Sequence, residues 1–88
     1  MRVIHRLVGY DQKTDRAKVS FKVAGRLLSN AKRIAKVPND DPQAVWSYPL
    51  SPDQVSELAK LIGARLDPAE AEYFLEAFAD STPKGRAA

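Results

Sequence analysis

Few residues in this chain are suited to chemistry, and the first to consider is His5, the only histidine of a chain without cysteine. A metal site needs several His, Cys or carboxylate ligands that converge, and none stands at ligand spacing around His5. A serine nucleophile would need His5 and a carboxylate behind it, which the spacing does not suggest. We therefore expect a structural, partly buried and hydrogen-bonded histidine that faces Phe21 across a hairpin.

The acidic residues offer two further pairs. Asp40 and Asp41 are adjacent in a loop, whereas a calcium loop alternates its acids over about twelve residues and closes with Glu. Glu72 and Glu76 are four residues apart on an expected helix, and as catalysts they would need a cleft and perturbed pKa values. The glycines are isolated, so no phosphate-binding loop is expected. The sequence predicts no catalytic, cofactor-binding or metal-ligating residues, no cofactor, and no enzyme.

Composition indicates an ordinary folded domain. The chain has 88 residues, of which 44% are hydrophobic and 28% charged, and this balance disfavours disorder. We expect one domain over residues 1–80 and a flexible tail over 81–88. No apolar run approaches the about 20 residues of a membrane helix, and the N-terminus has no signal-peptide pattern. The expectation is a cytoplasmic protein without a membrane partner.

Charge is distributed unevenly along the chain. Residues 1–37 hold ten of the fourteen Lys and Arg residues and two of the eleven acids, while residues 38–82 hold the other nine acids. Such asymmetry sometimes marks a nucleic-acid or membrane partner. The simpler interpretation is that the two halves neutralise each other across the fold.

The basic half begins with two expected strands, residues 2–10 and 16–23, joined by a polar link of hairpin length. A five-residue loop would pair Tyr10 with Arg16 and Leu7 with Val19. The inward face would then carry Val3, His5, Leu7, Ala17, Val19, Phe21 and Val23. The opposite face would be a mixed surface of cations, aliphatic residues and one tyrosine, and we take it as the candidate contact surface: Arg2, Ile4, Arg6, Val8, Tyr10, Arg16, Lys18 and Lys22.

Two helices follow from local signals. The spacing of apolar residues predicts a helix from about Arg26 to Lys36, which would be a turn shorter if Ser29 is its N-cap. The second helix has a Ser51 N-cap, Pro52 at the first position and Gln54 in the capping-box position. Gly63 supplies its left-handed end.

Between these helices, the alternation around the only tryptophan predicts a strand with Trp46, Tyr48 and Leu50 on one buried face. It could pair with either edge of the hairpin. After Gly63, Asp67 and the following proline resemble a second N-cap. The helical spacing of Ala71, Phe74, Leu75 and Phe78 then predicts a final helix that ends near residue 80.

Taken together, the sequence predicts an α+β fold of order β-β-α-β-α-α: a small, three-stranded, mainly antiparallel sheet with helices packed on one face. The expected core includes Val3, Trp46 and Phe78. With no catalytic group in view, the favoured function is a non-catalytic interaction module that binds a protein partner or a second copy of itself. The alternative is nucleic-acid binding through the basic hairpin face and the first helix.

Overall fold

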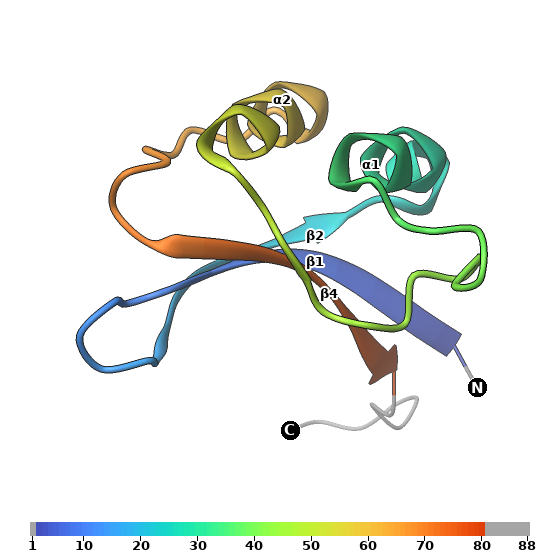
Figure 1. Cartoon of the computed structure of the whole chain (residues 1–88), viewed down its shortest axis with the longest axis horizontal. Coiled ribbons are helices and arrows are strands. Elements are labelled where there is room, and N and C mark those ends of the chain that lie inside the picture. The colour runs from blue at the N-terminus through green and yellow to red at the C-terminus, as the bar shows by residue number, and fades with distance from the viewer. Residues whose placement is uncertain (1, 81–88) are drawn as a thin grey trace, which may run out of the picture.

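The sheet forms one layer of the molecule and the helices form the other. The computed structural model describes residues 2–80, and in it two α-helices lie side by side on one face of a four-stranded antiparallel sheet (Figure 1). The strand order is β2-β1-β4-β3. Along the chain the elements are β1 (Arg2–Tyr10), β2 (Ala17–Val23), a 3₁₀ turn (Gly25–Leu27), α1 (Leu28–Ala35), β3 (Tyr48–Pro49), α2 (Pro52–Ile62) and β4 (Glu72–Asp80).

The α+β class, the antiparallel sheet and the helices on one face agree with the sequence, but the strand count and the element order do not. The expected final helix is strand β4, so the sheet has four strands rather than three. β3 pairs with β4 and with neither strand of the hairpin. The expected tail, residues 81–88, lies outside the described residues.

β4 is a strand because its residues also alternate with a period of two. Tyr73 and Leu75 are buried on the helix side, and Phe74 and Phe78 point to the other face. Asp67 does make a cap-like hydrogen bond: its carboxylate accepts from the Ala69 N–H at 2.9 Å. Only a turn follows it, and no helix forms before β4. The helical spacing of the apolar residues was therefore a misleading coincidence.

The hairpin has the expected faces with a different register. Leu7 pairs with Phe21 and His5 with Val23, which is a shift of two residues from the predicted pairing. A shift of two keeps the side chains from Val19 to Val23 on their predicted faces, whereas a shift of one would reverse them all. Ala17 is the exception: it pairs with Tyr10 of the outer face and is exposed, so its prediction for the inward face is wrong. The register changes once more between Gly9 and Tyr10. Gly9 pairs with Val19 and Tyr10 with Ala17, so Lys18 has no partner in the β1–β2 pairing.

Both central helices were predicted from local signals. α2 has the full capping box between Ser51 and Gln54, with N–H to side-chain distances of 3.2 and 2.7 Å, and Gly63 follows it in the left-handed region. α1 is shorter than predicted, because its first turn is the 3₁₀ segment, and Ser29 is not its N-cap. The Gln54 side chain also donates to the Ile34 carbonyl at 2.9 Å, which joins α2 to α1.

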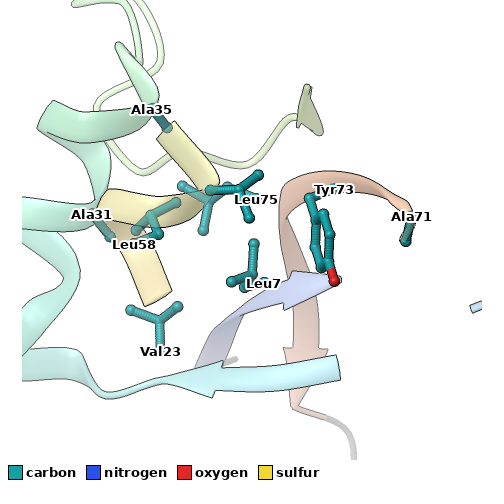
Figure 2. Close-up of a cluster of buried hydrophobic side chains, with 9 residues drawn as sticks. Leu7, Val23, Ala31, Ala35, Leu58, Ala71, Tyr73 and Leu75 are labelled. Atoms are coloured by element: carbon teal, nitrogen blue, oxygen red, sulfur yellow. The ribbon is translucent and has the colours of Figure 1, made fainter. Parts of the chain in front are cut away.

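The core lies between the sheet and the two helices. Figure 2 shows Leu58 of α2 on one side of Leu7 and Leu75 of the two central strands and the Tyr73 ring on their other side. Leu7, Leu58 and Leu75 are fully buried. Three residues predicted for the core are instead exposed: Val3, Trp46 and Phe78. Trp46 precedes β3, which has only two residues, so the expected Trp46 strand does not form.

Gly9 gives a test of this packing. A Cβ at Gly9 would lie 2.6 Å from the Tyr73 ring and 2.9 Å from a Val19 methyl group. We expect Gly9→Ala to lower the free energy of unfolding by about 1–3 kcal/mol, the usual cost of overpacking a core. Denaturant unfolding measures this. Gly25→Ala is the matched control, since its added Cβ meets nothing within 4 Å, and a similar loss in both variants would contradict the packing described.

Candidate functional site

The predicted contact surface lies on the sheet face away from the helices. The β1–β2 register places Arg6 opposite Lys22 and Val8 opposite Ser20 on this outer face. Arg16 lies in the hairpin loop and is exposed, and Lys18 lies at the irregularity of β2. Arg2 begins β1, but its side chain is outside the described part of the structure.

Strand β4 changes this surface, because it lies beside β1 and contributes its own side chains. Ile4 pairs with Phe78 and Val8 with Phe74. Ile4 is consequently half-buried and Val8 is only 3% exposed. Val8 is therefore part of the packing and cannot serve as a contact residue as predicted.

A hydrogen-bonded network occupies the middle of the outer face. The Tyr10 hydroxyl donates to Glu76 at 2.5 Å, and the Ser47 hydroxyl donates to the other carboxylate oxygen at 2.9 Å. The Tyr10 ring meets Phe74 edge-on, with centroids 5.7 Å apart. The bond to Glu76, with partial burial and the carboxylate charge, raises the pKa of Tyr10 to about 12. Tyr10 is thus a fixed, neutral part of the face.

The outer face is not uniformly cationic. Arg6 pairs with Lys22 across the β1–β2 ladder and with Glu76 across the β1–β4 ladder, so it has one cationic and one acidic neighbour. Its Nε donates to the Ser20 hydroxyl at 2.5 Å. Glu72, which is also on β4, pairs with Tyr10 of β1. The cations follow β1 and β2, and the acids follow β4, so the face has two charge zones.

The loop before β3 is held by a buried carboxylate. Asp41, which is 5% exposed, accepts hydrogen bonds from the N–H groups of Val45 and Trp46 at 3.0 and 3.2 Å and from the Tyr48 hydroxyl. Burial alone would raise its pKa, but these three bonds and the nearby His5 outweigh it and lower the pKa of Asp41. Ala44 completes the turn with a positive φ of 51°.

His5 anchors the same loop from the sheet. Its Nε2 lies 2.9 Å from the Gln43 carbonyl and 3.1 Å from the Ala44 carbonyl. Carbonyl oxygens only accept, so this nitrogen carries a proton and donates. The expectation of a buried, hydrogen-bonded histidine is confirmed, although His5 pairs with Val23 and not with Phe21.

Four large apolar side chains of the described residues are exposed, and we call the part of the molecule that carries them the apolar end: Val3, Val45, Trp46 and Phe78. Trp46 is 69% exposed and the other three are 43–49% exposed. Val3 and Phe78 are one position apart along the β1–β4 ladder, so they lie at the same end of the sheet but on opposite faces. Val45 and Trp46 directly follow Ala44, whose carbonyl is bonded to His5 near the same end.

A pocket of about 400 Å³ lies at the opposite end, where β4 begins and β3 turns into α2. It is lined mainly by apolar and aromatic side chains, with Gln12 and Glu72 among the polar ones. Within residues 2–80 no cluster of three or more His, Asp or Glu side chains is close enough to hold a metal ion. No described helix is long and apolar enough to cross a bilayer.

Fold and surface together define a small α+β protein with one helix-covered and one open sheet face. The chain belongs to the family DUF7683, described as a domain of unknown function, whose model matches residues 4–76. No curated protein and no solved structure matches the chain. The matched range includes both helices, the loop around Trp46 and the first part of β4.

Sequence reasoning found the outer residues of the hairpin and missed those of β4. Phe74, Glu76 and Phe78 share that face, but the helix prediction placed them elsewhere. It also placed Trp46 in the core. The signal that could have corrected this was Asp41, because an acid a few residues before a turn often accepts backbone N–H bonds.

Asp41 gives a pH-dependent prediction. A carboxyl group whose pKa is lowered by folding contributes stability above its unfolded pKa of about 4 and loses it as the pH falls through the lower folded value. We expect the stability of the wild-type protein to fall between about pH 4 and pH 2. Asp41→Asn should lower stability at neutral pH and weaken that acid dependence.

Denaturant midpoints measured across this pH range test the prediction. Asp40→Asn, at the exposed neighbouring residue, is the matched control and should behave like the wild type. Equal effects of the two substitutions would show that the Asp41 carboxylate does not hold the loop.

Proposed function

We propose that this protein is a non-catalytic protein-binding module whose contact site is the apolar end of the sheet. The observation that carries the proposal is the position of Trp46. An exposed tryptophan gives up the hydrophobic stabilisation that burial would provide, and an exposed apolar surface is typical of interaction sites. Tryptophan is also among the residues that contribute most to binding at protein interfaces.

The geometry of the loop supports this proposal. His5 and Asp41 fix the backbone around Trp46 through four hydrogen bonds, and the Tyr48 hydroxyl donates to Asp41 in turn. A loop that is already ordered loses little conformational entropy when it binds. Trp46 is therefore presented in a fixed position, with Phe78 and Val3 at the same end of the sheet.

Trp46→Ala tests the proposal. Because Trp46 is mostly exposed, we expect its removal to change the free energy of unfolding by no more than about 0.5 kcal/mol. Binding to the partner should weaken by about tenfold or more, as for a tryptophan at the centre of an interface. Trp46→Phe should retain much of the affinity. Lys60→Ala, an exposed position on α2, is the control and should change neither property.

Two measurements distinguish the possible partners. Sedimentation velocity over a range of protein concentrations detects a second copy of the chain, and a dimer should dissociate in Trp46→Ala. If the protein is monomeric, affinity capture with cross-linking, followed by binding with the purified partner, detects another protein. A monomer that captures the same proteins with and without Trp46 would contradict the proposal.

Nucleic-acid binding is the second candidate, and one arrangement favours it. Tyr10 and Phe74 lie on the two central strands of the open face, beside Arg6 and Lys22. Aromatic and cationic side chains on an open sheet can stack bases and neutralise phosphates. It ranks second because Glu76 carries negative charge in the same area and already engages Tyr10.

A labelled single-stranded oligonucleotide tests this alternative at low salt. If it binds, Lys22→Glu should weaken the complex for every sequence and reduce the salt dependence. Trp46→Ala should then have little effect, since the aromatic and cationic residues concerned lie elsewhere on the sheet. Absence of binding at low salt would eliminate nucleic acid as a ligand.

A further inference from the structure

The pocket at the start of β4 has a buried floor and an exposed rim. Its volume is about 400 Å³. Val55, Ala71 and Tyr73 form the floor and are almost completely buried, whereas Pro49 and Pro52 on the rim are exposed. Glu72 pairs with Tyr10, so the pocket lies at the opposite end of the β1–β4 ladder from Phe78, which pairs with Ile4.

The hollow exists because β3 leaves the sheet early. The Leu50 N–H donates to the Tyr73 carbonyl at 2.9 Å, and the chain turns into α2 two residues later. Glu72, which precedes Tyr73 and is the first residue of β4, is not paired with β3. Three of the lining residues are prolines, whose fixed φ makes the walls stiff.

The rim is acidic. Glu72 lines the pocket, and Asp53, Asp67 and Glu70 are each adjacent in sequence to a lining residue. The Tyr73 hydroxyl donates to the Asp67 carbonyl oxygen at 3.4 Å, which places the Asp67 backbone beside the pocket floor. Burial raises the pKa of Tyr73, and the charges of Glu70 and Asp67 raise it further. The Lys18 amino group approaches this rim through a bond of 3.4 Å to the Glu70 carbonyl oxygen.

We propose that this pocket binds a small organic cation, whose apolar part contacts the floor while its protonated amine faces Glu72. The volume falls in the range of small-molecule pockets, about 300–1,000 Å³. Tyr73 and Phe74 also line the pocket, and the face of an aromatic ring attracts a cation. This site is separate from the apolar end and does not depend on the function proposed there.

The probe is 4-phenylbutylamine, compared with its neutral alcohol and with the carboxylate of the same chain length. Amide chemical shifts of the labelled protein are followed during titration with each. We expect shifts at Val55, Ala71 and Tyr73, and the affinity order amine, alcohol, carboxylate. Because Glu72 is exposed, the preference of amine over alcohol should be modest, about two- to fivefold, and it should shrink at high salt.

Matched variants separate charge from fold. Glu72→Gln should remove the preference for the amine and leave the binding of the alcohol unchanged. Glu57→Gln, at an exposed position on α2 that does not line the pocket, should retain the preference. Trp46→Ala should also retain it, so failure at this site and failure of the proposed interface can be distinguished.

Several results would overturn the proposal. They are no shifts with any probe, shifts away from the pocket, and equal affinities for all three compounds. A lysine-containing peptide that binds the pocket more tightly than the amine would replace the small-molecule proposal with a peptide site. In every case the unfolding midpoint of each variant is measured, so that a loss of binding is not confused with a loss of fold.

Discussion

The fold depends on the pairing of β1 with β4. Their ladder runs from Arg2 opposite Asp80 to Tyr10 opposite Glu72, over the full length of both strands. It makes β1 an interior strand, with β2 on its other side. Leu75 comes to lie opposite Leu7 on the helix side, while Phe74 lies opposite Val8 on the outer side. One pairing therefore completes the core and covers part of the open face.

The same pairing determines the electrostatics of the open face. Without β4, the hairpin would present cations and aliphatic side chains to solvent, as the sequence predicted. With β4 in place, Glu76 lies opposite Arg6 and binds Tyr10. A face that carries both charges does not attract a polyanion over its whole area. This is the physical reason why protein binding is proposed ahead of nucleic-acid binding.

The parts of the fold that could be predicted are those determined by residues close together in the sequence. The capping box of α2 uses residues within one turn, and it was predicted residue by residue. The faces of the hairpin follow from alternation alone, and they were also predicted, although the register was not. β4 could not be predicted from its own residues, because Phe74 and Leu75 fit a helix and Tyr73 and Leu75 fit a strand.

What decides between these alternatives is distant in the chain. β1 needs a neighbour on its second edge to satisfy its backbone groups, and that neighbour is about 70 residues away for the pair Ile4 and Phe78. Pairing over such a separation leaves no trace in a window of ten residues. Tertiary context therefore overrode the local helical pattern.

The candidate site was harder to predict than the fold, because its main residue contradicts the usual expectation for its type. A lone tryptophan in an alternating segment normally indicates a buried strand. Here the backbone N–H groups that would pair in a strand, those of Val45 and Trp46, are bonded to Asp41 instead. The carboxylate thus competes successfully with the sheet for these two donors.

This competition bears on whether the exposure of Trp46 is incidental. A large apolar side chain gains about 1.5–3 kcal/mol from burial, so an unconstrained loop would tend to fold the indole against the sheet. The hydrogen bonds of Asp41 and His5 fix the backbone on both sides of Ala44, and in this arrangement the indole is 69% exposed. The same bonds stabilise the loop within the monomer, and they leave the indole exposed for the partner proposed above.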